Sequence, residues 1–553
     1  MWNTDDWGTL ILALPQSNLG SRIMVTTTSQ PVAEHCSSLS GHVYRMSTLG
    51  DDHSRELFWH SLTSKCSVEE KKQLSMVIDI CDGLPLALIE SAKSFMKDMI
   101  ENSACKEAVH MVCAPEERDN VTLRRMQWVL MNKYSGLTSY GARACLLYFH
   151  MFPIDDAIKR KSLILLWLAE ELVGKGDDLK ISDLEAASKH LMTLVDGNII
   201  RPMQVSSNAT VKSSMLPGTM YEFISRKSIS ENFVAFSDYD ITPAKPEHIR
   251  RLSLHGGPRQ YAKCIAKVEL YLLQTLAVSG EACTVIMNFS QYKILRVLDM
   301  KRCDSQLDKA SLEAIWKLIM LKYLGLPGNI GKVPKDIRDL QNLETLDVDV
   351  VGTEIVELCK EVIKLPKLKH LLGKFRLSSE RYKNYNVERS ILETFSGFVT
   401  NRQAVVFPQL MIHMKQLRKV KMWCNFSADN GEVKHHSDAI KKFIREGVTE
   451  HVPLRKIINE PNDRSLTIDI TGCKKVPFLK SLEAPGKLSK LKLHGDLEEV
   501  PKFLIPQKIP GTEEFSTPMK VTSLCLSLTT LCGSSSLLPF QLKDGVTLLP
   551  TLI

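Results

Sequence analysis

Four Gly-Lys pairs are the first candidates for chemistry, because a glycine-rich turn followed by a lysine is a common way to hold a phosphate. Such a cradle needs backbone N–H groups, the lysine and a Ser or Thr hydroxyl on Mg²⁺, in the order G-x-x-x-x-G-K-[ST]. None of the four lysines precedes Ser or Thr. The pairs are Gly174-Lys175, Gly331-Lys332, Gly373-Lys374 and Gly486-Lys487. The sequence therefore lacks this type of phosphate site.

Asp5 and Asp6 are the second candidates, since two acids at the end of an apolar strand can bind Mg²⁺ beside a nucleotide. Only four residues precede them, too few for the strand that would present them. We interpret both as acids in the first turn of a helix, where the helix dipole favours negative charge.

Catalytic signatures are also missing. The sequence has no G-x-S-x-G, no H-E-x-x-H and no spaced Cys–His constellation, so we expect no enzyme. His150, beside Phe149 and Phe152, is interpreted as a core histidine. The 14 cysteines form no C-x-x-C pair, which favours free thiols in a reducing compartment over zinc ligands or disulfides.

Composition indicates a folded chain of two to four domains. Its 553 residues are 44% hydrophobic and 24% charged, with a net charge of +8. That excess is small for the length, and basic stretches such as "RRMQW" are expected to be solvated faces, so we expect no nucleic-acid partner. No signal peptide or transmembrane segment is predicted, which favours a cytoplasmic protein that is nuclear or membrane-peripheral only through partners.

The first 236 residues show a change from α/β to helical character. "SRIMVTTT" and "HVYRMSTL" are predicted strands within residues 1–50. A helix is expected to begin in "DDHSRELFWHSL", with capping residues at its start. Gly83 is expected to end one helix and Pro85 to lie in the first turn of the next. Several further helices followed by the strand "RPMQV" are typical of a winged-helix arrangement.

Beyond a polar, proline-containing segment, a hexamer of the form L-x-x-L-x-L recurs at steps of 22, 26, 22 and 25 residues. This spacing is the signature of leucine-rich repeats, in which stacked units bury their leucines and align short strands. The regular copies begin at Leu273, Leu295, Leu321, Leu343 and Leu368, and related ones at Leu417 and Leu488. The pattern becomes irregular after about residue 505.

These landmarks, in this order, resemble the plant nucleotide-binding leucine-rich-repeat disease resistance proteins. "GSRIMVTTT" is similar to the strand that ends "TTR" in that family, and "CDGLPLAL" to its "GLPLA" motif. "CLLYFHMFPIDDAIKRKSLILLWLAEELV" resembles the winged-helix signature "CFLYCSIFPEDYEIKRKRLIRLWIAEGFV". "EHIRRLSL" is similar to the "HVRRLSL" that opens the repeats.

The resemblance implies a domain order and an N-terminal truncation, because the chain begins after the family's Walker B acids. The fold class expected is a partial P-loop-type α/β remnant, then helical and winged-helix domains, then a leucine-rich-repeat solenoid. The expected ranges are 1–50 (partial nucleotide-binding domain), 51–134 (helical, ARC1-like), 135–236 (winged helix, ARC2-like), 237–247 (linker) and 248–553 (repeats).

The family's nucleotide switch is expected to be degraded. The arginine after "TT" that senses the γ-phosphate is Thr28, which cannot make a bidentate charged contact. The family's "MHD" aligns best with "MYEF", so Tyr221 and Glu222 replace its histidine and aspartate. Pro85 matches the proline that contacts adenine, although a plain helix start explains it equally well. We expect ADP and ATP binding, the family's cofactor function, to be weak or absent.

The resulting functional hypothesis is an immune receptor-like protein that recognises protein partners through its solenoid, whether a pathogen effector, a guarded host protein or a sibling receptor. The alternatives are a non-switching scaffold or decoy, a protein that completes a nucleotide site in trans, and a gene-model fragment of a full receptor. Lys322, Glu344, Thr345 and Lys369 are expected to face solvent on one concave surface.

Overall fold

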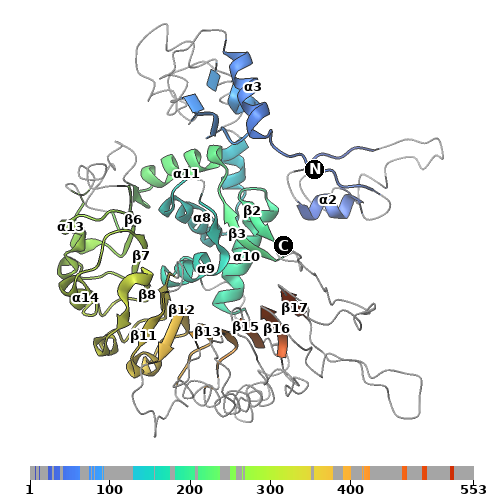
Figure 1. Ribbon diagram of the computed structural model, residues 1–553. Coiled ribbons are helices and arrows are strands. Elements are labelled where there is room, and N and C mark those ends of the chain that lie inside the picture. Colours follow the sequence, from blue (N-terminus) through green and yellow to red (C-terminus); the bar gives the residue numbers. More distant parts are fainter. Residues whose placement is uncertain are drawn as a thin grey trace, which may run out of the picture. The chain divides into compact units, whose positions relative to one another are not determined.

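A computed structural model gives the chain as two compact units (Figure 1), each of which is described by itself. Unit 1 comprises Met1–Ser253 and Lys263–Glu269, and unit 2 comprises Leu254–Ala262 and Leu270–Ile553. The residues that the structure describes are 23–27, 30–37, 41–62, 74–92 without 76, 80 and 90, 129–174 without 155, 181–205, 210–236, 249–256, 268–349, 354–377, 390–399, 416–423, 464–469, 488–494 and 523–527, with residues 7, 12, 265 and 414.

The N-terminal part of unit 1 contains α2 (Gln30–Ser37) but not the two strands expected there. Residues 23–27 and 41–50 have no strand structure, and the side chains of Ile23 and Met24 are 54% and 91% exposed. A strand requires a neighbouring strand for its backbone N–H and C=O groups, and neither segment belongs to a sheet among the described residues. The prediction of these strands is therefore wrong for the residues described.

A small apolar core joins α3 (Asp51–Ser61) to the helical residues that follow it. Gly50, rather than an acid, stands at the N-cap of α3, and Asp51 and Asp52 lie in its first turn. Their carboxylates stabilise the helix through its dipole and not, as expected, as caps. The core is formed by Phe58, Leu62, Leu74, Val77, Ile78, Cys81, Ala87, Leu88 and Ala92.

Gly83 forms the turn that closes this core. Its φ of +67° is left-handed, and a Cβ there would lie 2.1 Å from the carbonyl oxygen of Leu49. The close approach is useful, because the backbone N–H of Leu49 donates to the carbonyl of Gly83 at 2.9 Å. Only glycine fits this position. Pro85 then begins the helical residues 85–89, as the sequence predicts.

The rest of unit 1 combines helices with a three-stranded antiparallel sheet in the order β1-β3-β2, of which β2 and β3 are labelled in Figure 1. The helix expected before residue 200 is confirmed, with a Ser182–Glu185 capping box at its start, and so is the strand "RPMQV". The elements are α8 (Tyr140–Leu147), η1 (Tyr148–Met151), β1 (Ile158–Lys159), α9 (Arg160–Ala169), α10 (Asp183–Asp196), β2 (Arg201–Val205), β3 (Val211–Met215), α11 (Gly218–Ser230), β4 (Ala235–Phe236) and β5 (Arg251–Gly256), within which the division between the units falls.

Helix α9 is the centre of this core. Its sequence "RKSLILLWLA" is apolar on every side after the first turn, and Leu163, Leu166 and Trp167 are all buried. A helix that is apolar all round is stable only when other elements surround it. The Trp167 ring meets Phe149 of η1 edge to face, with centroids 6.2 Å apart.

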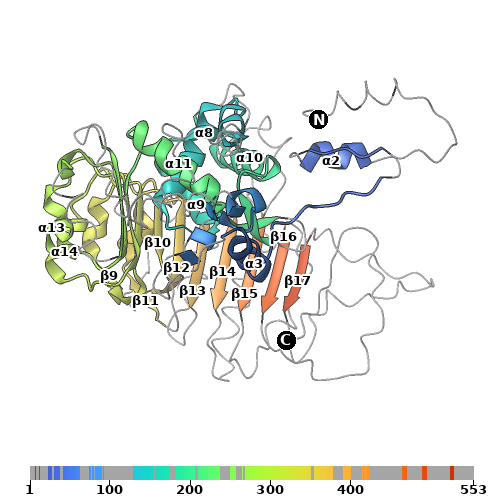
Figure 2. The ribbon, with the colours of Figure 1, turned by 90° about the horizontal axis from the view of Figure 1, so that it is seen from above.

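Unit 2 is built on a parallel sheet, whose strands follow one another in space in chain order (Figure 2). The strands are β6 (Thr275–Gly280), β7 (Val297–Cys303), β8 (Tyr323–Leu326), β10 (Thr345–Val348), β12 (His370–Leu377), β13 (Thr394–Val399), β14 (Lys419–Trp423), β15 (Arg464–Asp469), β16 (Leu488–His494) and β17 (Ser523–Ser527), with β9 (Lys332–Val333) and β11 (Val356–Leu358) beside this path. The helical turns are η3 (Leu270–Leu272), α13 (Thr284–Met287), η4 (Phe289–Gln291), α14 (Lys309–Ile315), η5 (Gly328–Ile330), η6 (Lys335–Asp339) and η7 (Lys360–Lys364).

The repeated leucines stand in register across this sheet. Leu298, Leu324, Leu346 and Leu371 are successive Cα partners, and each is at most 1% exposed. The row continues through apolar residues of β13, β14 and β15. The sequence prediction of stacked repeats is confirmed for these strands, because each repeat covers the leucine of the next.

We predict that Leu324→Ala destabilises unit 2 by about 2–5 kcal/mol, since it leaves a cavity between two neighbouring repeats. Lys322→Ala, two residues earlier and half-buried, is the matched control and should change stability by no more than about 0.5 kcal/mol. Urea unfolding followed by circular dichroism measures both. Equal losses would show that the leucine row does not hold the repeats together.

Candidate interaction surface on the repeat sheet

The side of the sheet away from the leucine row carries polar side chains, and we call it the polar face. Alternation along each strand creates it, because successive side chains point to opposite sides. In β14, Val420 and Met422 are buried, whereas Lys419, Lys421 and Trp423 lie on the polar face. Strand register then aligns these positions from one repeat to the next.

The charge along one row of residues on the polar face changes from acidic to basic across the sheet. Its acidic end lies on β7 to β10 and its basic end on β14 to β16. The successive Cα partners are Asp299, Gly325, Asp347, Leu372, Ser396, Lys421, Thr467 and Lys492. Neither end was foreseen from the sequence, because opposite charges dispersed along the chain become one row only through the register.

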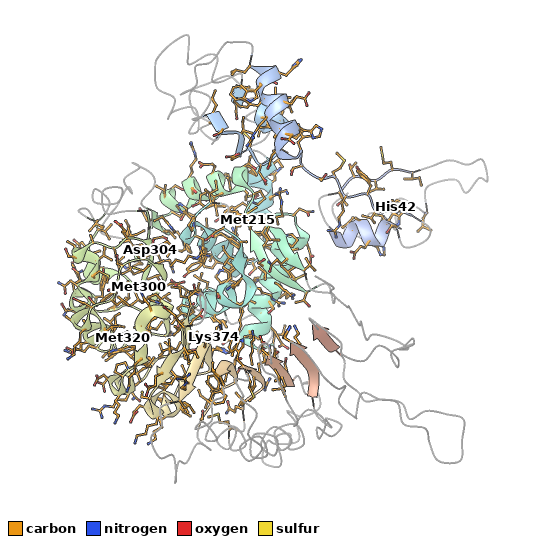
Figure 3. All side chains as sticks on the ribbon, in the orientation of Figure 1. His42, Met215, Met300, Asp304, Met320 and Lys374 are labelled. Atoms are coloured by element: carbon orange, nitrogen blue, oxygen red, sulfur yellow. The ribbon has the colours of Figure 1, made fainter. Side chains whose placement is uncertain are left out.

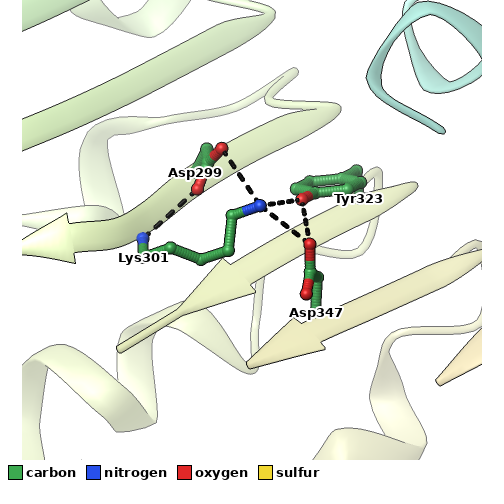
Figure 4. Close-up of polar contacts among 4 residues, drawn as sticks. All are labelled: Asp299, Lys301, Tyr323 and Asp347. Carbon is green, nitrogen blue, oxygen red and sulfur yellow. Dashed lines mark hydrogen bonds and ion pairs between the residues drawn. The ribbon is translucent and has the colours of Figure 1, made fainter. Parts of the chain in front are cut away.

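The acidic end is an ordered cluster of Asp299, Lys301, Tyr323 and Asp347 (Figure 4). The Lys301 ammonium donates to the Tyr323 hydroxyl at 2.8 Å and to Asp347 Oδ2 at 2.7 Å. The Tyr323 hydroxyl donates to the same carboxylate oxygen at 2.8 Å. Asp299 lies 3.8 Å from the ammonium and accepts from the backbone N–H of Lys301 at 3.2 Å. We call these four residues the acidic cluster.

Burial and charge act against each other in this cluster. Burial alone would lower the pKa of Lys301, but Asp299 and Asp347 together raise it above its ordinary value. Burial raises the pKa of Asp299, and the ammonium of Lys301 only partly opposes this. Lys301 therefore stays charged at neutral pH, which makes it a fixed electrostatic partner and excludes a neutral amine nucleophile at this position.

Gly325 provides the space for this arrangement. It stands between Asp299 and Asp347 in the row, and a Cβ there would lie 2.6 Å from Asp299 Oδ1. Any larger residue would displace that carboxylate. The signal in the sequence is the glycine of "LKYLGL", at a position where the neighbouring repeats "LRVLDM" and "LETLDV" have aspartate.

Lys421 and Lys492 of the basic end, together with Trp423 of β14 and Lys374 of β12, are the four residues that we call the basic cluster; Lys374 is labelled in Figure 3. The Lys421 ammonium lies 4.1 Å from the centre of the Trp423 ring, and the Lys374 ammonium lies 5.4 Å from it. Both distances allow attraction between a cation and the ring face. A bulge at Gly373, where φ is +151°, directly precedes Lys374.

The lysines of the basic cluster disfavour one another's charge. The pKa of Lys421 is lowered mainly because the group is partly buried, and the nearby Lys374 and Lys492 contribute smaller effects in the same direction. Asp469 of β15 opposes the shift but does not cancel it. The cluster thus concentrates positive charge around an indole ring, an arrangement suited to binding an anion.

The four positions expected to face solvent give a mixed result. Lys322, Glu344 and Lys369 are half-buried, and Lys369 lies 3.5 Å from Glu344. Thr345 is only 3% exposed, so its prediction as a solvent-facing residue is wrong. It stands between Tyr323 and His370 in the register, and these two larger side chains flank the small threonine on both sides.

Comparison with known proteins agrees with this architecture. The family described as "Leucine-rich repeat region" matches residues 273–511. Disease resistance protein RGA4 of Oryza sativa subsp. japonica is 38% identical over 534 residues, which cover 95% of this chain and 50% of RGA4. Disease resistance protein Pik-2 of the same plant is 30% identical over 387 residues, covering 68% of this chain and 37% of Pik-2.

The chain belongs to the plant nucleotide-binding leucine-rich-repeat disease resistance proteins. It spans about half the length of RGA4 (50%), so what a whole resistance protein does is not carried over by similarity alone. Among solved structures, a plant peptide hormone receptor, RGFR1 in complex with RGF2, is 14% identical with a TM-score of 0.23, covering 51% of this chain and 39% of that one. A score this low supports no statement on the fold.

The three residues that the resemblance assigns to a nucleotide site differ in their surroundings. Thr28 is outside the described residues. Pro85 is exposed at its helix start. Tyr221 is buried in α11, where its hydroxyl donates to the carbonyl of Phe152 at 3.0 Å and its ring meets that of His150 edge to face. Their roles towards a nucleotide stay predictions, and His150 is buried as expected of a core residue.

The "CDGLPLAL" motif makes an ion pair that the sequence patterns do not predict. Asp82, directly before Gly83, accepts two hydrogen bonds from the Arg201 guanidinium of β2, at 2.9 and 2.7 Å. Such a two-point contact fixes orientation as well as charge. Burial raises the pKa of Asp82 and Arg201 opposes it. No spacing rule could have paired residues so far apart in sequence.

The remaining groups with possible chemistry among the described residues are the cysteines and potential metal ligands. Cys36, Cys81, Cys145, Cys283, Cys303 and Cys359 are free, in agreement with the expectation of unpaired thiols. Burial raises the pKa of Cys81 to about 11, which disfavours the reactive thiolate form at neutral pH. Within the same residues, no His, Cys, Asp and Glu side chains group as a metal site, and no helix combines the length and apolar character needed to cross a bilayer.

We predict that Tyr323→Phe destabilises unit 2 by about 1.5–3 kcal/mol, because its hydroxyl bonds two charged partners in the acidic cluster. Tyr292→Phe is the matched control. It removes one bond from a buried hydroxyl to the carbonyl of Ile286 and should cost about 0.5–1.5 kcal/mol. Urea midpoints give both values, and a smaller loss for Tyr323→Phe would show that the cluster does not depend on the hydroxyl.

Proposed function

We propose that this resistance-family protein is an immune receptor-like recognition protein that binds a protein partner on the polar face of unit 2. The partner would be a pathogen effector, a guarded host protein or a sibling receptor. The observation that carries the proposal is the row in which the register places aspartates on β7 and β10 and lysines on β14 and β16. The disease resistance proteins to which the chain is similar support the same role.

The polar face has the properties of a binding surface. Its side chains project from hydrogen-bonded strands, so little backbone entropy is lost when a partner binds. Trp423 is a large aromatic residue surrounded by charge, the type of residue that often dominates binding energy. Fixed charges at both ends provide the electrostatic complementarity that selects one partner over another.

Unit 1 is proposed to be the regulatory part of the receptor. Helices α8, α9 and α10 with the β1-β3-β2 sheet support a winged-helix domain at 135–236, and the α3 core supports a helical domain at 51–134. The P-loop-type remnant at 1–50 and the linker at 237–247 complete the proposed order, although the linker lies outside the described residues. A cytoplasmic location is part of this proposal.

A chain of these 553 residues is proposed to bind ADP or ATP weakly or not at all, since it contains no G-x-x-x-x-G-K-[ST] sequence. The Tyr221 hydroxyl, which already donates to Phe152, supports the alternative of a non-switching scaffold or decoy. Weak binding completed in trans by another chain is compatible with the exposed Pro85. In either case we propose no enzymatic activity.

Complementation tests recognition directly. Plants whose gene is disrupted should support more pathogen growth, and the wild-type gene should restore resistance. Glu344→Lys with Lys369→Glu reverses a charge pair near the polar face and should fail to restore it. Lys309→Glu with Glu313→Lys on α14 is the matched control, because it reverses a similar pair away from the sheet. Full resistance with both double variants would contradict recognition by this face.

We predict no measurable ADP binding by calorimetry on the purified chain. Loss of three charge-assisted phosphate contacts, each about 1.5–3 kcal/mol, weakens a micromolar site by about three to six decades. The melting temperature should likewise not respond to ADP with Mg²⁺. Co-purification of one ADP per chain would contradict the prediction, while leaving partner recognition by unit 2 unaffected.

A further inference from the structure

We propose that the basic cluster of Lys374, Lys421, Trp423 and Lys492 is a docking site for an acidic segment of the protein partner. The inference rests on the proposed function, recognition by the polar face, and adds the chemistry of what is recognised. It follows from the arrangement of ammonium groups around the Trp423 ring and from the position of the acidic cluster in the same row.

Register brings the basic cluster together from three strands. Lys374 comes from β12, Lys421 and Trp423 from β14, and Lys492 from β16. Lys421 and Lys492 are both aligned with Thr467, so a single strand separates them, about 10 Å at the usual strand spacing. A carboxylate above Thr467 could therefore reach both lysines, and a second could reach Lys374.

A bound anion would relieve the electrostatic repulsion among the lysines of the basic cluster. The pKa of Lys421 is lowered first by partial burial, and repulsion from Lys374 and Lys492 adds to this shift even though the Asp469 carboxylate opposes it. Carboxylates placed between the ammonium groups convert the repulsion into ion pairs. Trp423 holds the Lys421 and Lys374 ammonium groups close to its ring, so little side-chain entropy is lost on binding.

The position of the acidic cluster favours a protein segment over a uniformly charged polyanion as the ligand of the basic cluster. Asp347 and Lys421 occupy the same row three strands apart, about 14 Å, which exceeds the Debye length at physiological salt. The acidic end and the basic end therefore attract or repel a ligand independently of each other. A nucleic acid or anionic membrane covering the row would meet Asp299 and Asp347 as well as the lysines. A protein segment can place its carboxylates over the basic cluster alone.

The length of the row from Asp299 to Lys492 determines how long a partner segment must be to cover it. Seven strand steps separate Asp299 from Lys492, which is about 34 Å and is spanned by about ten extended residues. The segment that fits best is acidic where it crosses β12 to β16 and neutral or basic where it crosses β7 to β10. Its charge order would fix its direction across the sheet.

The test uses the full chain and a fluorescein-labelled oligoglutamate peptide, with binding followed by fluorescence anisotropy at low salt. We expect oligoglutamate to bind, oligoglutamine of the same length not to bind, and added salt to weaken binding. Lys421→Glu and Lys374→Glu should each weaken binding by about tenfold or more. Lys309→Glu on α14, whose side chain is 92% exposed, makes the same charge change away from the cluster and should alter binding by no more than about twofold.

Lys421→Gln is the second variant in case the reversed charge prevents folding, which circular dichroism detects. It should weaken oligoglutamate binding by less than Lys421→Glu does. Equal binding by wild type, Lys374→Glu and Lys421→Gln would overturn the proposal. So would binding of polyuridine RNA or phosphatidylserine vesicles that depends on Lys421 when oligoglutamate does not bind. Either of these results could occur while the Glu344→Lys with Lys369→Glu variant still fails to restore resistance. In that case the proposed recognition by the polar face would stand, and only the inference of an acidic partner segment would be wrong.

Discussion

Pairing between parallel strands is the constraint on which the rest of the structure depends. A buried backbone N–H or C=O group needs a partner, and in unit 2 each strand finds one in the next repeat. Leu298, Leu324 and Leu346 then stack because the pairing holds them in register. Residues 23–27, although β-branched and apolar, form no strand and belong to no sheet among the described residues.

Register also determines the chemistry of the polar face. Side chains alternate along a strand, so a shift of one residue would exchange the leucine row with the charged row. Burial of Leu324 and Leu346 excludes that shift, and the same restriction fixes Asp299, Gly325 and Asp347 as neighbours. The acidic cluster contributes little net stability by its charges, since their desolvation offsets their attraction. Its role is to hold charge in one place.

The sequence could predict what depends on local patterns. The leucine spacing predicted the stacked strands, Pro85 marked a helix start, and "RPMQV" is β2 to the residue. It could not predict what depends on contacts between distant segments. The Asp82–Arg201 pair, the cation–π contacts of Trp423 and the burial of Thr345 all arise from neighbours that no spacing rule identifies. The position of Thr345 in its repeat strand predicts exposure, but the larger side chains on the neighbouring strands bury it.

The two sides of the sheet therefore differ in how freely they can change. A substitution at Leu324 leaves a cavity that two repeats share, so that side is limited to apolar residues of similar volume. A substitution at Lys421 alters charge on a half-buried surface and leaves the leucine row intact. If the polar face binds a partner as proposed, positions such as Lys421 can change to select that partner while the leucine row stays intact, because the pleat of each strand points the two sets of side chains to opposite sides.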